Sequence, residues 1–61
     1  MIKLDARLYN LNAKSYAEAG KFDMAITTAQ LALKCAYEQQ NNDLVSHLRN
    51  QLKLYKQKKT K

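Results

Sequence analysis

Apolar and polar positions recur with the period of an α-helix along most of the chain, and no segment alternates as a β-strand does. From about residue 4 to residue 19, a wide arc of apolar and small side chains lies beside one polar stripe. At 100° per residue, that stripe consists of Lys3, Arg7, Asn10, Lys14 and Glu18. A helix needs about 100° of apolar surface to pack on one neighbour. An arc roughly twice as wide indicates contact with two neighbours.

The only glycine in the chain, Gly20, follows this first helical segment, and there is no proline. Glycine adopts the left-handed conformation that commonly ends helices at no steric cost. Asp23 then falls in the first turn of the next helix, where a negative charge suits the helix dipole. We expect a tight corner between antiparallel helices, with Tyr16 and Phe22 packed across it.

Two further helices are predicted, over about residues 22–40 and 43–57. The second segment carries small residues every three or four positions, which allow a neighbouring helix to approach closely: Ala25, Ala29, Ala32 and Ala36. Polar residues 41–43 supply candidate N-caps for the third segment. That segment has a narrow apolar arc made of Leu44, Val45, Leu48, Leu52 and Tyr55. The prediction is an all-α unit over residues 1–57, an antiparallel helical hairpin with a third, capping helix, followed by a frayed basic tail at 58–61.

Aromatic and small residues recur at regular spacing over about residues 6–39: Tyr9, Ala13, Tyr16, Gly20, Phe22, Ala25 and Ala32. In this spacing the hairpin resembles the tetratricopeptide repeat family. Three positions depart from the family pattern, namely Asn12 for a leucine, Ala29 for an aromatic residue and Tyr37 for a proline. Asn12 places an amide where the core of the hairpin is expected.

The resemblance implies a helix pair that stacks on copies of itself, with residues 43–57 as the terminal cap. The chain would then be the end of an array, an excised repeat or a designed minimal unit. Because about three repeats are normally needed for stability, we expect self-association, and a symmetric dimer is the commonest outcome. The residues expected to pack in this way are Leu4, Leu8, Tyr9, Leu11, Tyr16, Ala29 and Leu31.

The resemblance also implies that the first helix lines a concave groove in which an extended peptide lies. The residues expected to face the partner are Arg7, Asn10, Lys14 and Glu18. Two cations flanking an amide suit a carboxylate or an acidic segment. The alternative reading of these residues is a solvated helix face. A non-catalytic protein-interaction or scaffold module is therefore the predicted function.

The net charge of +6 lies in the C-terminal part, because cations and anions are equal in number over residues 1–48. The unbalanced cations are Arg49, Lys53, Lys56, Lys58, Lys59 and Lys61. They offer an alternative function, electrostatic binding of nucleic acid or another anionic surface. The neutral body disfavours it, since a lysine-rich tail is also a common aid to solubility.

The chain offers no constellation of catalytic residues, so we expect neither an enzyme nor a bound metal or cofactor. His47 is the only histidine and lacks partners at metal-ligand spacing, so we expect a solvated helix residue. Cys35 is the only cysteine, which excludes a disulfide framework and, without a hydrophobic leader, points to the cytoplasm. No apolar run reaches the roughly 20 residues of a membrane span.

Overall fold

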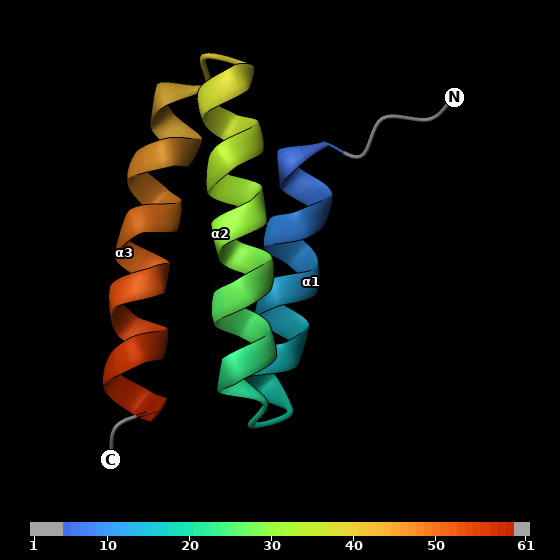
Figure 1. Cartoon of the computed structure of the whole chain (residues 1–61), viewed down its shortest axis with the longest axis vertical. Coiled ribbons are helices and arrows are strands. Elements are labelled where there is room, and N and C mark those ends of the chain that lie inside the picture. The colour runs from blue at the N-terminus through green and yellow to red at the C-terminus, as the bar shows by residue number, and fades with distance from the viewer. Residues whose placement is uncertain (1–4, 60–61) are drawn as a thin grey trace.

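The computed structural model describes residues 5–59 (Figure 1). Its three helices are α1 (Ala6–Glu18), α2 (Phe22–Glu38) and α3 (Asn42–Lys59), and residues 5–59 contain no strand. The prediction of an all-α fold, a helical hairpin followed by a third helix, is confirmed. The third helix is longer than predicted, since it includes Lys58 and Lys59, which were assigned to a frayed tail. Cations in the last turn of a helix interact favourably with its dipole, which accounts for this extension.

The first helix begins at Ala6 because Asp5 caps it. Asp5 has an extended backbone, and its carboxylate accepts a hydrogen bond of 3.3 Å from the backbone N–H of Arg7. Such a cap satisfies one of the N–H groups that have no partner in the first turn. The predicted start at about residue 4, and with it Leu4, lies outside the described residues.

Gly20 forms the predicted corner between α1 and α2. Its φ of +79° lies in the left-handed region. The backbone N–H of Lys21 donates to the carbonyl of Tyr16 at 2.9 Å, which closes the turn as in a glycine-terminated helix. Tyr16 and Phe22, on either side of the corner, pack on the same buried cluster. The chain therefore reverses direction here, as the sequence predicted.

The corner between α2 and α3 has the same left-handed geometry as the first corner, but with a glutamine in place of a glycine. Gln40 adopts a left-handed φ of +56°, and the N–H of Asn41 donates to the carbonyl of Ala36 at 2.9 Å. The side chain of Asn41 then accepts a hydrogen bond of 3.3 Å from the N–H of Leu44, and so caps α3. A polar N-cap was expected within residues 41–43, and Asn41 provides it.

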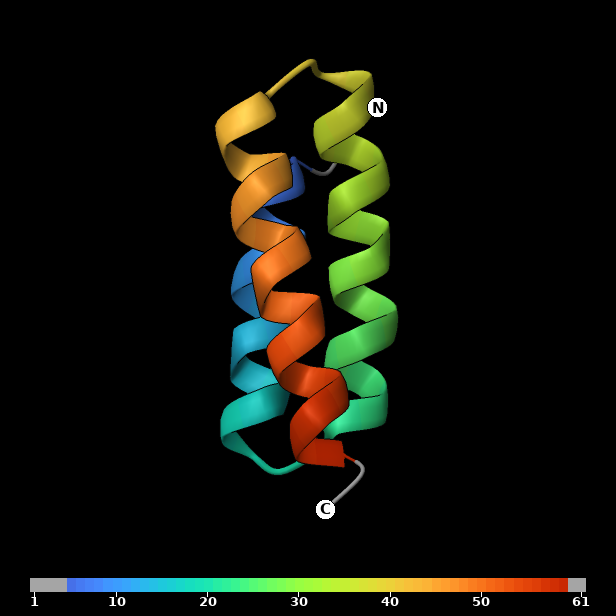
Figure 2. The same cartoon turned by 90° about the vertical axis from the view of Figure 1, so that its left-hand side faces the viewer.

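The second helix forms the centre of the fold. It lies between α1 and α3 in Figure 1, and Figure 2 shows α1 and α3 on the same side of it. Both outer helices pack along α2, whereas they contact each other at few positions. The completely buried side chains that α2 presents to them are alanines, flanked by partly buried residues such as Ile26 and Leu33: Ala25, Ala29, Ala32 and Ala36. Because these residues are small, both neighbours approach α2 closely, and a groove is left between α1 and α3.

Candidate functional site: the groove between α1 and α3

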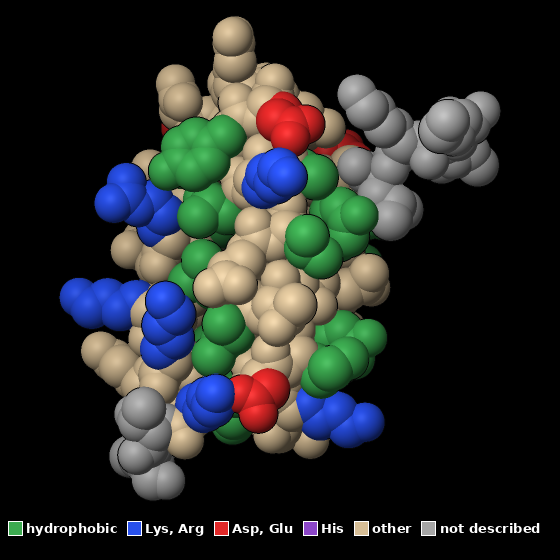
Figure 3. Space-filling view, viewed as in Figure 1, with side chains coloured by type: hydrophobic (Ala, Val, Ile, Leu, Met, Phe, Trp, Pro, Cys, Tyr) green, Lys and Arg blue, Asp and Glu red, His purple; other side chains and the backbone are tan. Residues whose placement is uncertain are grey.

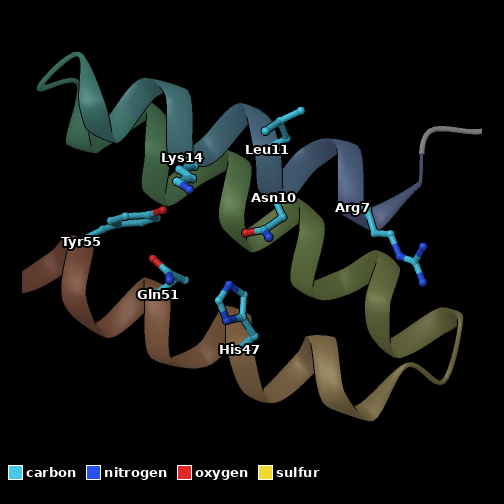
Figure 4. A pocket seen from close by; sticks show the side chains of 7 residues that line it. All are labelled: Arg7, Asn10, Leu11, Lys14, His47, Gln51 and Tyr55. Carbon is cyan, nitrogen blue, oxygen red and sulfur yellow. The ribbon is translucent and has the colours of Figure 1, made fainter.

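An open groove of about 420 Å³ lies between α1 and α3 (Figure 4). The side chains of one wall belong to α1 and those of the other to α3. Its lining residues are Arg7, Asn10, Leu11 and Lys14 on α1, and His47, Gln51 and Tyr55 on α3. Residues three or four positions apart share one face of a helix, so each wall is a continuous stripe.

The groove has a buried floor and exposed rims. Tyr55 is only 4% exposed and packs into the core cluster beside Leu52. Asn10 and Gln51 are half-buried, and their amides point into the space between the helices (Figure 4). Arg7, Lys14 and His47 are exposed; Arg7 lies at one end of the groove, whereas Lys14 and His47 point into the space between the helices (Figure 4). A ligand in the groove would therefore meet neutral hydrogen-bonding groups together with positive charge.

A second depression extends the groove toward the end of α1. It shares Lys14, Gln51 and Tyr55 with the first and adds residues of both walls: Ala17, Glu18, Leu54 and Lys58. The residues predicted from the sequence to face a partner, Arg7, Asn10, Lys14 and Glu18, thus all line this continuous groove. The α3 wall was not predicted, because a single helical stripe does not show which other helix it will face.

Tyr55 supplies a neutral hydroxyl at the junction of the two depressions. Burial, and secondarily the nearby negative charge of Glu18, raises the pKa of the Tyr55 phenol above its ordinary value of 10.0. The phenol therefore stays protonated over the whole physiological range and keeps its capacity to donate a hydrogen bond.

The charge of the groove is predominantly positive. Arg7, Lys14 and Lys58 line it, with Glu18 as the one carboxylate among its lining residues. His47, expected to be a solvated residue, is indeed exposed, yet it lines the groove. Within residues 5–59, no group of histidine, cysteine and acidic side chains is arranged to hold a metal ion. The donors present suit a carboxylate-bearing ligand.

The residues expected to mediate self-association divide into two sets. Leu8, Leu11 and Leu31 are exposed, with 47%, 59% and 47% of their surface accessible. Tyr9 and Tyr16 are half-buried against the core of the same chain, and Ala29 is buried completely. Ala29 therefore packs within the molecule and is unavailable to a second one. Leu4 lies outside the described residues.

The basic residues of α3 do not form one patch. Arg49, Lys53 and Lys56 follow a stripe on the outer side, Lys58 lines the groove, and Lys59 forms an ion pair with Asp23. Lys61 lies outside the described residues. No helix in the described part of the chain is sufficiently long and apolar to cross a membrane.

Comparison with known proteins adds no relative to this picture: neither a family model, nor a curated protein, nor a solved structure matches the chain. The resemblance to the tetratricopeptide repeat therefore stays a prediction, carried by the residues from Tyr9 to Ala32.

Proposed function

We propose that the chain is a non-catalytic protein-interaction module whose α1–α3 groove binds an acidic peptide segment. The observation that supports this best is the convergence of Arg7, Asn10 and Lys14 with the α3 residues Gln51 and Tyr55 on one groove. A concave surface on which polar groups converge is a default candidate for a binding site.

The spacing of the two α1 cations indicates how such a segment is arranged. Arg7 and Lys14 are separated by seven residues of helix, which corresponds to about 10 Å along the axis. An extended peptide advances about 3.3 Å per residue. Carboxylates three positions apart in the ligand would therefore reach both cations, and the amide of Asn10 between them would bond to the peptide backbone.

The test is titration calorimetry with a capped synthetic peptide that carries glutamates three positions apart. Arg7→Glu combined with Lys14→Glu is expected to abolish binding while leaving the helicity intact. A matched variant, Lys34→Glu with Arg49→Glu, makes the same change in net charge on exposed positions outside the groove. It is expected to bind as the parent does. Unchanged binding by the groove variant would contradict the proposal.

Self-association is the second part of the proposal. It is favoured by large apolar side chains left exposed on the hairpin, among them Leu8, Met24 and Leu31. Light scattering and circular dichroism over a hundredfold dilution series test it. A dimer that loses helicity as it dissociates supports the proposal, whereas a folded monomer at every concentration contradicts this part and leaves the groove as the interaction surface.

Electrostatic binding of an anionic polymer is the alternative function, favoured by the stripe of Arg49, Lys53 and Lys56. Phosphate contacts made by this stripe would weaken steeply with salt, with a log–log slope close to the number of phosphates engaged. A binding constant for a nucleic-acid oligomer that does not change between low and physiological salt would exclude it. The proposed setting for either function is the cytoplasm.

A further inference from the structure

We propose that two copies of the chain pair across a two-fold axis, through the same surface of the α1–α2 hairpin, and do not stack head to tail. This surface, the open flank, consists of Leu8, Asn12, Ser15, Met24, Thr28, Leu31 and Cys35. The inference rests on the proposed self-association and adds its geometry.

The open flank is the side of the hairpin that faces away from α3. On α2, the completely buried alanines face the other two helices, and the stripe of Met24, Thr28, Leu31 and Cys35 lies to one side of them. Figure 3 shows hydrophobic side chains along the α1 edge of the molecule, over α1 and α2. Leu8, Met24 and Leu31 each keep close to half of their surface accessible. Four of the seven flank residues are apolar, namely Leu8, Met24, Leu31 and Cys35, and an exposed apolar patch bordered by polar residues is typical of an interface.

The surface on the opposite side of the molecule, the outer side of α3, is polar. Ser46, Arg49, Asn50 and Lys53 occupy the outer side of α3, and all of them are exposed. Head-to-tail stacking would place this surface against the apolar flank of the next copy and would remove its cations from water without partners, which is unfavourable. The apolar surface that complements the open flank is therefore the open flank of a second copy.

The charges around the flank favour an antiparallel arrangement. Its stripes contain no charged residue, Asp5 lies at one end beside the start of α1, and Lys21 lies at the other end beside the hairpin corner. A two-fold axis perpendicular to the helices brings Asp5 of each copy toward Lys21 of the other. Like charges do not meet, and two opposite-charge contacts form at the rim.

The extent of the flank sets the strength of the dimer. It is two helices wide, and α1 with its 13 residues is about 20 Å long. A surface of this extent belongs to the small interfaces that bury less than about 1,200 Å² in total, which are generally transient. We therefore expect a dimer that dissociates on dilution, and no larger species at high concentration, because a two-fold contact closes on itself.

Cross-linking between identical positions distinguishes the two geometries. In a Cys35→Ser background, Asn12→Cys places a single thiol on the open flank, and Asn50→Cys places one on the outer side of α3. A two-fold dimer predicts that a short bis-maleimide joins two copies of the Asn12→Cys protein and joins few copies of the Asn50→Cys protein. Efficient cross-linking only in an equimolar mixture of the two proteins, as a heterodimer of the Asn12→Cys and Asn50→Cys chains, would show head-to-tail stacking and overturn the inference.

A matched pair of substitutions on α2 provides an independent test. Leu31 and Tyr37 are both exposed on this helix, at 47% and 55%, but only Leu31 belongs to the open flank. Leu31→Lys is expected to weaken the dimer by about tenfold or more, whereas Tyr37→Lys leaves its dissociation constant unchanged at equal net charge. Equal weakening by both would overturn the inference. A parent protein that stays monomeric would instead contradict the proposed self-association itself.

Discussion

Lys59, in the last turn of α3, forms an ion pair with Asp23, in the first turn of α2. The pair joins the C-terminal end of α3 to the hairpin corner, across an edge of the molecule at which the backbone has no other link. Each residue also complements its own helix, since Asp23 is near the positive end of the α2 dipole and Lys59 is near the negative end of the α3 dipole.

This ion pair is expected to contribute little free energy of unfolding. Its side chains are 52% and 77% exposed, and exposed pairs are typically worth about 0.2–1 kcal/mol. A double-mutant cycle with Asp23→Asn and Lys59→Gln should give a coupling free energy below about 1 kcal/mol, and added salt should reduce it. A larger coupling, or one insensitive to salt, would mean that the end of α3 is held more firmly than its exposure indicates.

The core should be most sensitive at Leu48, the largest side chain that is completely buried. Leu48→Ala leaves a cavity and is expected to lower the free energy of unfolding by about 2–5 kcal/mol, which is a large part of the stability of so small a domain. Leu54→Ala is the control, because Leu54 is 42% exposed and its truncation should cost far less. Urea denaturation followed by circular dichroism measures both. Similar midpoints for the two variants would contradict this description of the core.

A side chain should destabilise both helix corners, because both have a left-handed backbone, so adding one at Gly20 and removing one at Gln40 should have opposite effects. Gly20 has a left-handed φ, and a Cβ atom there would meet no atom within 4 Å, so the cost of Gly20→Ala is backbone strain alone, about 1 kcal/mol. Gln40 has a left-handed φ without being glycine, so Gln40→Gly should relieve strain and raise the thermal midpoint. A lower midpoint for Gln40→Gly would show that its side chain stabilises the corner.

The raised pKa of Tyr55 predicts a loss of stability in alkali. Burial and the charge of Glu18 keep the phenol protonated in the folded state at a pH at which the unfolded chain already ionises it. The unfolded state thus binds fewer protons once the pH rises above 10.0, the ordinary value, and the free energy of unfolding falls until the pKa of the folded state has been passed. At pH values below 10.0, Tyr55 makes its full contribution to the free energy of unfolding.

Tyr55→Phe should remove this part of the alkaline loss, and Tyr37→Phe, at an exposed position, should retain it. The ultraviolet absorbance of the phenolate follows the titration, and denaturation at each pH follows the stability. Identical alkaline profiles for the two variants would mean that Tyr55 does not carry the effect.

Helix number, order and the first corner follow from the sequence because each depends on local chemistry. Gly20 marks one corner, since no other residue adopts its conformation as readily. The second corner was harder to locate, because Gln40 takes a left-handed conformation that its residue type does not favour. Its geometry is fixed instead by the cap that Asn41 provides and by the packing of the helices on either side.

Of the two walls of the groove, the sequence predicted the α1 wall and not the α3 wall. The stripe of Arg7, Asn10 and Lys14 is visible in helical periodicity, whereas its pairing with His47 and Gln51 depends on which helices become neighbours across α2. The positions of His47, Gln51 and Tyr55, four residues apart, would have indicated a second wall once α3 was placed on the same side of α2 as α1.

The self-association residues show the same limit. Helical periodicity placed Leu8, Leu31 and Ala29 alike among the residues expected to contact a second copy. It did not show that Ala29 is buried within the hairpin whereas Leu8 and Leu31 stay exposed. Asn12, expected to place an amide in the core of the hairpin, is exposed on the open flank. Whether a helix position is covered by the same chain depends on the packing of all three helices, which is not a local property of the sequence.

The alanine-lined centre of the fold also determines how the protein responds to heat. Within the described residues, six of the ten buried hydrophobic side chains are alanines, so unfolding exposes little apolar surface for each residue. The heat capacity change should then lie at or below the usual value of about 12–15 cal/mol/K per residue, and the melting enthalpy of so short a chain is small. The small melting enthalpy makes the melting transition broad, with a fraction of molecules unfolded well below its midpoint. A ligand in the groove or a second copy on the open flank would draw that fraction back to the folded state, so occupancy by a partner would set the range of temperature over which the chain stays folded.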